Sequence, residues 1–320
     1  FSTVNLHIFQ TYYGGLRPSA DMTSWIYGDY DLVKQFIEGG QTLKQWLEAQ
    51  GSTFVEDTQP TLIGALWYRE NEFVGATIDG VDYPGRWGTY FKAPMNTVLA
   101  TSETAASNKI MLRTTAEELI VEDGRVTGVK ATQYDGTPVT AHATKGVVIA
   151  TGGYAANLQM VVDTNVYWSS DYLSTSTKTT NRSSLKGDGI TMALSAGASL
   201  SQMDQIQLLQ VCNPWTGVTS DVITGGVDAC IYVNQEGNRF VREDGRRDVI
   251  SAAILAQTGG RMYTIHNYTV VDDPDTYRCL GGRTVSSLIE EGRYGFVKAD
   301  TLEELAEKIN VPYENLKASL

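Results

Sequence analysis

The chain has 320 residues, of which 42% are hydrophobic and 19% are charged, a composition typical of folded globular proteins and not of disordered ones. The formal net charge of −12 argues against nucleic acid as a partner, because phosphate binding requires a basic face. No stretch approaches the roughly 18 uninterrupted apolar residues of a membrane span. Three scattered cysteines and three distant histidines predict neither a disulfide framework nor a metal site.

The first predicted element is helical and begins at Asp31. Apolar residues recur at helical spacing on both sides of Gly39-Gly40, so one interrupted helix and two helices in a hairpin fit equally well. Gly51 stands where a glycine commonly ends a helix. Residues 1–28 and 52–95 give no clear prediction.

Residues 109–150 favour strands. Turns are predicted at Glu122-Asp123-Gly124-Arg125 and at Asp135-Gly136-Thr137, between runs rich in β-branched residues. Because Asp-Gly between such runs is a strong hairpin signal, the segment predicts a β-meander. The next stretch, "GVVIATGGYAAN" (146–157), contains a continuous apolar run, which predicts a strand buried on both faces.

Two glycine-containing segments could approach a ligand closely. Thr151-Gly152-Gly153 follows the predicted buried strand, and Gly187-Asp188-Gly189 precedes a predicted helix of about residues 190–196 that Gly197 closes. A helix N-terminus with bare glycine amides is suited to an anion or a hydroxyl group. Taken alone, either segment is more often a tight turn or a helix cap.

The last third contains a predicted hairpin at 229–241 and two predicted helices. Asp248 is expected to cap a helix over 249–257 that Gly259-Gly260 ends. A second helix, at 300–309, begins with a capping box formed by Thr301 and Glu304.

Four arginines and three acids crowd the stretch "RFVREDGRRD" (239–248). The arginines are Arg239, Arg242, Arg246 and Arg247. On local evidence they form solvated ion pairs with their acidic neighbours, each contributing about 0–1 kcal/mol.

The order of these features resembles a known family. The chain has, in this order, a predicted strand that ends in Ala-Thr-Gly-Gly, a Gly-Asp-Gly, an Asn-x-x-Gly-x-Arg-Phe and an Arg-Asp at a helix start. This series resembles the one in the flavoprotein subunits of fumarate reductase and succinate dehydrogenase and in related flavin-dependent enoate reductases. The resemblance runs from about Lys34 to the end of the chain. It implies a mixed α/β and α+β fold, in which residues 1–204 form part of a Rossmann-like FAD-binding domain with a β-meander, and residues 205–320 form an incomplete α+β capping domain.

The resemblance also implies roles for individual residues. FAD is the expected cofactor, and Arg247 matches the family's proton-donating arginine, whereas the other three arginines are expected to be structural. The positions expected to lie near the cofactor are Ala150, Thr151, Gly152, Gly153, Gly187, Asp188 and Gly189. The expected activity is reduction of the C=C bond of an α,β-unsaturated carboxylate.

Two departures from the family limit the expected substrate. Leu208, Leu209 and Gln210 occupy the place of a His-Pro-Thr segment that grips a substrate carboxylate, and leucine cannot donate a hydrogen bond. The family's Thr-Glu-Gly segment falls on residues 220–226, which contain no glutamate. Fumarate is therefore not expected, and an aryl or heteroaryl acrylate packed against the leucines fits better.

The family's GxGxxG fingerprint is absent from these residues. We therefore expect this stretch, taken alone, to bind FAD poorly and to be inactive. An electron-donor protein or domain is a further expected partner. The expected compartment is the cytoplasm, the periplasm or the cell surface of a bacterium, and the residues do not distinguish among them. The alternatives are a flavin-dependent dehydrogenase of the ketosteroid type, which uses tyrosines in place of the arginine, and a non-catalytic truncated flavoprotein module.

Overall fold

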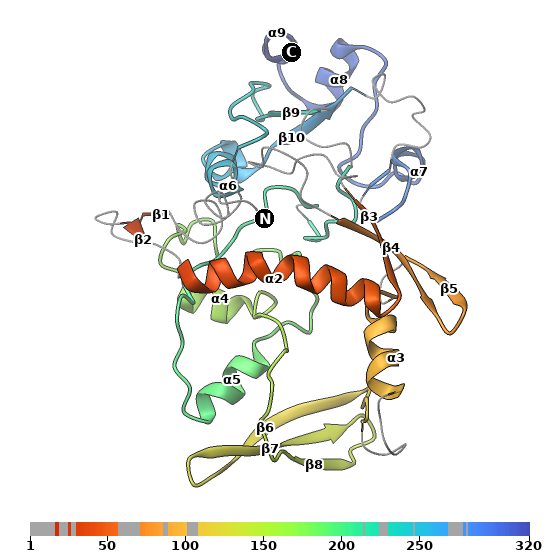
Figure 1. Cartoon of the computed structure of the whole chain (residues 1–320). Helices are drawn as coiled ribbons and strands as arrows, with labels where there is room; N and C mark the ends of the chain where they lie inside the picture. The colour runs from red at the N-terminus through yellow and green to blue at the C-terminus, as the bar shows by residue number, and fades with distance from the viewer. Residues whose placement is uncertain are drawn as a thin grey trace. The chain divides into compact units, whose positions relative to one another are not determined.

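The computed structural model describes residues 17–18, 25–26, 30–56, 71–85, 89–100, 108–213, 215–223, 230–245, 247–267, 278–279 and 281–320. The chain divides into two compact units, Phe1–Leu112 and Arg113–Leu320, whose elements are labelled in Figure 1. The predicted domain boundary between residues 204 and 205 lies inside the second unit and stays a prediction. Among the helices of the described ranges, none has the length and apolar character needed to cross a membrane.

In the first unit, a short antiparallel pair of β1 (Arg17–Pro18) and β2 (Trp25–Ile26) precedes the helix α2 (Tyr30–Ala49). This helix is continuous through the two glycines, so the helical hairpin is wrong. Glycine costs about 1 kcal/mol relative to alanine inside a helix, which is too little to end one that is otherwise well formed. Gly51 follows with a φ of 101°, as predicted for the residue that ends the helix.

A three-stranded antiparallel sheet lies in the region that gave no clear prediction. Its strands are β3 (Ser52–Glu56), β4 (Asn71–Ile78) and β5 (Val81–Pro84), in that order, and η1 (Thr89–Phe91) and α3 (Lys92–Ala100) follow. Asp79 and Gly80 form the turn between β4 and β5, with φ values of 51° and 76°. This Asp-Gly dipeptide is the same hairpin signal that predicts the later meander, and it would have located these strands.

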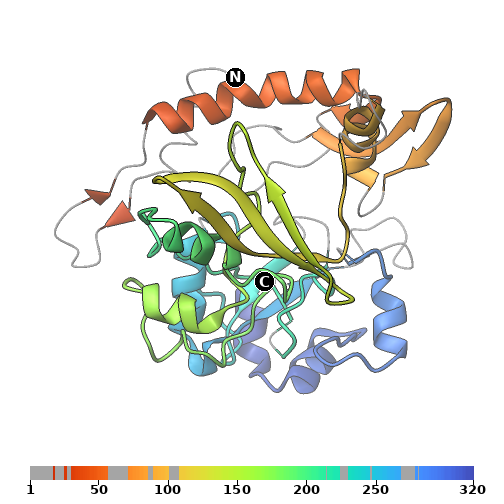
Figure 2. The ribbon, with the colours of Figure 1, turned by 90° about the horizontal axis from the view of Figure 1, so that it is seen from below.

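The second unit begins with the predicted β-meander, which is confirmed. Strands β6 (Thr114–Glu122), β7 (Arg125–Gln133) and β8 (Pro138–His142) form one twisted antiparallel sheet (Figure 2). Positive φ at Gly124 and Gly136 marks the two predicted turns. Gly128 in the central strand admits no side chain, because an added Cβ would stand 2.3 Å from the carbonyl oxygen of Ala141.

The buried strand predicted at residues 146–150 is wrong. These residues form no strand, and the side chains of Val148 and Ile149 are 90% and 40% exposed. A strand buried on both faces needs neighbours on both edges to satisfy its backbone groups, and the described residues supply none for this segment. The apolar run therefore has no strand partner among the described residues.

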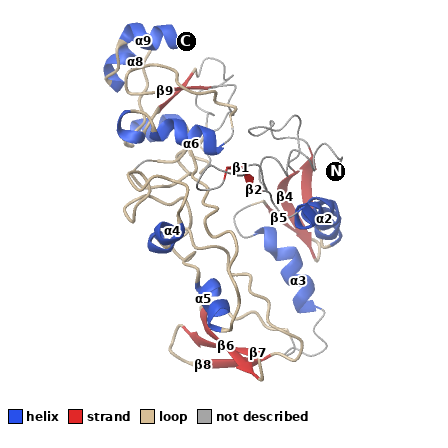
Figure 3. Ribbon diagram, turned by 90° about the vertical axis from the view of Figure 1, so that its left-hand side faces the viewer, coloured by secondary structure: helices blue, strands red, loops and turns tan. Residues whose placement is uncertain are grey.

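Loops dominate the second unit between β8 and β9 (Figure 3), with two short helices, α4 (Leu158–Thr164) and α5 (Asp188–Ser195). The helix α5 begins two residues earlier than predicted, and Gly197 follows its end with a φ of 89°. A buried cluster of Val161, Trp168 and Leu173 joins α4 to the loops that follow it.

Strands β9 (Cys230–Val233) and β10 (Tyr263–His266) pair antiparallel beside α6 (Arg247–Leu255), which η3 (Thr258–Gly260) follows (Figure 1). The hairpin predicted at 229–241 is therefore only partly formed, because its return arm touches β9 at a single bridge between Val233 and Arg239. Asp248 lies in the first turn of α6 and is not its cap, because the helix begins earlier than predicted.

The last elements are α7 (Val285–Glu290), α8 (Leu302–Ile309) and α9 (Tyr313–Ser319). The Thr301 hydroxyl accepts a hydrogen bond from the Glu304 N–H at 3.2 Å, which confirms the capping box. The Glu304 carboxylate returns to the N–H of Asp300, one residue earlier than the usual motif. A second buried cluster joins α8 and α9 to β9 through Val233, Ile309 and Leu316.

Candidate functional site

The arginines of residues 239–248 differ in their partners. Arg239 makes a two-point ion pair with Glu243, and Arg242 makes one with Asp244 at 2.9 and 2.7 Å. Arg246 lies outside the described residues. Arg247 is partly buried at the start of α6, and within the described part of the chain its guanidinium makes no hydrogen bond or ion pair. Among the three arginines of this group that the structure describes, it is therefore the one whose charge is available to a ligand.

The face of α6 that carries Arg247 also contacts the predicted substrate-binding segment. Ser251 lies one helical turn after Arg247, so the two side chains share a face. Its hydroxyl, buried with 4% of the residue exposed, donates a hydrogen bond of 3.3 Å to the carbonyl oxygen of Leu208. The helix face that carries Arg247 and Ser251 therefore lies against the segment that contains Leu208.

Leu208, Leu209 and Gln210 are all partly buried. Leu208 packs against the buried cluster of Val161, Trp168 and Leu173. The Oε1 atom of Gln210 is buried and has no hydrogen-bond partner among the described residues. A buried acceptor without a donor costs about 1–3 kcal/mol, which a ligand N–H or O–H placed there would recover.

The two glycine-containing segments lie against each other, although 33 residues separate them in sequence. A Cβ added to Gly189 would stand 2.1 Å from Oγ1 of Thr151. The N–H of Ala156 donates to the backbone carbonyl of Leu185 at 2.9 Å. The side-chain amide of Asn157 donates to the backbone carbonyl of Lys186 at 3.2 Å. The predicted cofactor residues therefore lie together at one surface, at which Gly187 and Gly189 are buried. The sequence alone could not place them there.

This surface fits a group that carries hydroxyls and phosphates. Thr151, Gly152 and Gly153 are exposed, and a Cβ added to Gly153 would meet no atom within 4 Å. Asp188 is exposed in the first turn of α5, and its carboxylate makes no hydrogen bond or ion pair within the described part of the chain. Bare backbone amides and a free carboxylate are suited to the ribityl and ribose hydroxyls of a dinucleotide such as FAD.

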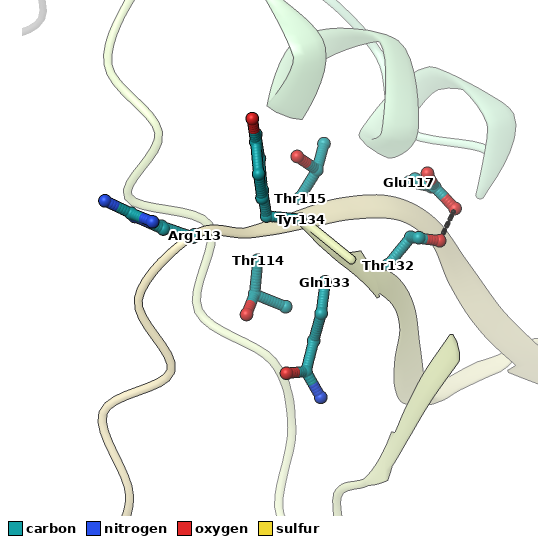
Figure 4. Close-up of a pocket in the computed structure, with 7 residues that line it drawn as sticks. All are labelled: Arg113, Thr114, Thr115, Glu117, Thr132, Gln133 and Tyr134. Carbon is teal, nitrogen blue, oxygen red and sulfur yellow. Dashed lines mark hydrogen bonds between the residues drawn. The ribbon is translucent and has the colours of Figure 1, made fainter. Parts of the chain in front are cut away.

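Two open hollows lie away from these residues. One is formed by the ends of β6 and β7, where Thr115 and Tyr134 lie on one side of the sheet and Thr114 and Gln133 on the other (Figure 4). The other is lined by Asn213, Trp215, Thr216 and residues 291–294 of the second unit. Neither contains a predicted site residue, so neither bears on the chemistry expected of Arg247.

Sequence reasoning missed two residues that shape this site. Ser251 reads as an ordinary helical serine, and its contact with Leu208 spans 43 positions. Glu243 reads as one acid in a charged loop, yet its side chain is 5% exposed and accepts hydrogen bonds from Arg239 and from the N–H of Tyr232. A glutamate four residues after an arginine is the only local signal, and it is common on protein surfaces.

Comparison with known proteins gives a family match over nearly the whole chain. Residues 2–320 match the family described as FAD binding domain. An NADH:acrylate oxidoreductase from Vibrio harveyi is 36% identical over 316 residues, covering 99% of this chain and 29% of the relative. A urocanate reductase from Eggerthella lenta is 29% identical over 300 residues, covering 92% of this chain and 45% of the relative. The chain thus spans less than half the length of these two relatives.

Among solved structures, a flavocytochrome c3 fumarate reductase in its open conformation aligns with a TM-score of 0.58 and 22% identity. The alignment covers 90% of this chain and 45% of that one. At this identity the likeness shows the fold alone. The predicted family resemblance, the mixed fold class and FAD as the cofactor are confirmed.

Proposed function

Because the chain belongs to the FAD binding domain family, we propose that it forms part of an FAD-dependent oxidoreductase that reduces the C=C bond of an α,β-unsaturated carboxylate. The observation that carries this proposal is the placement of Arg247 on the helix face that contacts the Leu208 segment, where its guanidinium makes no hydrogen bond or ion pair among the described residues. The relatives support the same reaction type, since their names describe reduction of acrylate and of urocanate.

The cofactor surface would hold FAD through Ala150–Gly153 and Gly187–Gly189, with the Asp188 carboxylate accepting hydrogen bonds from its hydroxyl groups. When bound and reduced, FAD supplies a hydride to the β-carbon of the substrate alkene. The residues of this chain then have two tasks, which are to hold the substrate and to protonate its α-carbon.

Arg247 would perform the protonation. Negative charge develops at the α-carbon, and a guanidinium N–H aimed there stabilises this charge before transferring its proton. A guanidinium is a poor acid towards water because its pKa lies above about 12. Towards a carbanion the transfer is downhill, and the neutral guanidine then recovers a proton from solvent.

The substrate would carry an apolar or heteroaromatic group beyond its carboxylate. Leu208 and Leu209 would pack against this group, and the unpartnered Gln210 Oε1 would accept a hydrogen bond from a ring N–H or a hydroxyl. Fumarate offers a second carboxylate, which this acceptor repels. An aryl or heteroaryl acrylate therefore suits these three residues better than a dicarboxylate does.

We also propose residues 1–204 as part of the FAD-binding domain and residues 205–320 as most of the capping domain, with an electron-donor protein or domain as partner. The ketosteroid-type dehydrogenase is less favoured, because that chemistry uses tyrosines where this chain places Arg247. A non-catalytic module is also less favoured, since both relatives reported above are named as enzymes.

The test is substitution of Arg247 by lysine in the intact, flavin-loaded protein. Reoxidation of the reduced flavin by a panel of enoates should slow by about 10²–10⁴-fold, the usual contribution of a positioned general acid, while flavin content stays unchanged. Arg242→Lys is the matched control, because Arg242 is 81% exposed and pairs with Asp244. Near-full activity of Arg247→Lys would remove the basis of the proposal.

A further inference from the structure

Glu243 is a buried carboxylate that the reaction outlined above does not use. We propose that Glu243, through its ion pair with Arg239, is a positioning residue that fixes the start of α6 and thereby the direction of the Arg247 guanidinium. This inference rests on the proposed role of Arg247. It concerns a residue that touches neither substrate nor cofactor and acts on the reaction through another side chain.

The hydrogen bonds of Glu243 join three parts of the chain. Its Oε1 accepts from the N–H of Tyr232 in β9 at 2.9 Å and from Nε of Arg239 at 3.0 Å. Its Oε2 accepts from Nη2 of Arg239. Burial alone would raise the pKa of the Glu243 carboxyl, but these hydrogen bonds hold it below its usual range, so the group is charged and fully engaged.

The backbone of Arg239 is hydrogen-bonded to other parts of the chain. Its N–H donates to the hydroxyl of Ser319 in α9 at 2.9 Å, and that hydroxyl donates to the carbonyl of Gly237. Arg239 also forms the bridge with Val233 of β9, which is fully buried. Glu243 is thus fixed to a frame made of β9 and α9, which pack together in one buried cluster.

The turn that carries Glu243 leads directly into α6. The N–H of Gly245 donates to the carbonyl of Arg242 at 3.2 Å, closing this turn two residues before the helix begins. A Cβ added to Gly245 would stand 3.4 Å from Cγ1 of Ile250, a fully buried α6 residue that packs with Tyr232. The frame that holds Glu243 therefore also holds the first turn of α6, where Arg247 lies.

The adjacent pair of Arg242 and Asp244 provides a matched comparison. It has the same two-point geometry, but its side chains are 81% and 50% exposed. Within the described residues, it makes no ion pair with another element. Substituting Asp244 by asparagine removes the same charge from the same turn without releasing the buried frame. An effect of charge alone would appear in both variants, whereas an effect of position would appear only at Glu243.

The experiment uses the intact flavoprotein with its flavin reduced anaerobically. Flavin reoxidation is followed after mixing with an enoate, which needs a proton from Arg247, or with ferricyanide, which takes electrons one at a time and needs none. Glu243→Gln should slow the enoate reaction about 10- to 100-fold, the cost of misplacing a reacting group by about 1 Å, with the ferricyanide reaction and the flavin content unchanged. Asp244→Asn should match the wild-type protein in both reactions.

Each outcome decides the question. Wild-type enoate rates in Glu243→Gln, or equal slowing of both reactions, would overturn the positioning role, since a purely structural defect affects both. If Glu243→Gln yields no soluble flavoprotein, Arg239→Lys replaces it, because lysine keeps the charge but not the two-point contact, and the same two readings apply. Should Arg247→Lys keep its activity, the proposed function fails instead, whatever Glu243 does.

Discussion

The contact between Gly189 and Thr151 can be tested by a single added methyl group. In Gly189→Ala the new Cβ would stand 2.1 Å from Oγ1 of Thr151 and 2.6 Å from Cγ2 of Ile149, where ordinary contacts are 3.4–4 Å. The side chains of Thr151 and Ile149 must therefore shift by roughly 1 Å, which disturbs the surface expected to hold FAD. Overpacking of this kind costs about 1–3 kcal/mol.

Because residues 149–151 are exposed and pair with no strand in the described part of the chain, they can move without unfolding the protein. We expect most of the cost to appear in cofactor affinity, as an FAD dissociation constant raised about 5- to 150-fold. The assay is a titration of the flavin-stripped intact protein with FAD, followed by quenching of flavin fluorescence.

Gly39→Ala is the matched control for this substitution. It also places alanine inside a helix, α2, but its Cβ would meet no atom within 4 Å. Both variants gain helix propensity, and only Gly189→Ala meets a neighbouring segment. If the two variants bind FAD equally well and melt at the same temperature, α5 does not contact Thr151 and the proposed cofactor surface is wrong.

Two further predictions concern charge. Asp188→Asn should raise the FAD dissociation constant about tenfold, because one charge-assisted hydrogen bond is lost. Unfolding in urea should be almost unaffected, since the side chain is exposed. Equal FAD affinity of the variant and the wild-type protein would count against this role of Asp188. Burial lowers the pKa of His266 from 6.5 to about 4, so the unfolded chain takes up this proton first and stability falls as pH drops from 6.5 towards 4. The free energy of unfolding is measured in urea at pH 7 and at pH 4.5, and between these values it should fall by up to about 3 kcal/mol less in His266→Asn than in the wild-type protein. An identical fall in both proteins would refute the assignment.

The elements predicted correctly are those whose causes lie within a few residues of sequence. Asp123-Gly124 adopts positive φ because these residue types tolerate it, and this fixes the turn between β6 and β7 wherever the sheet lies. The Thr301 capping box satisfies helix N–H groups with its own side chains. The family resemblance likewise depends on short motifs in a fixed order, which a sequence displays directly.

What the sequence could not determine depends on partners that are distant in the chain. The apolar run at 146–150 has the composition of a buried strand, but burial requires neighbouring strands, which these residues do not have in the described structure. The four arginines look alike in sequence, and only the folded structure shows that Arg239 pairs with a buried Glu243, whereas Arg247 makes no ion pair among the described residues. The chemical type of a side chain, which the sequence gives, determines which groups it can bind. The fold determines which of those groups lie within its reach.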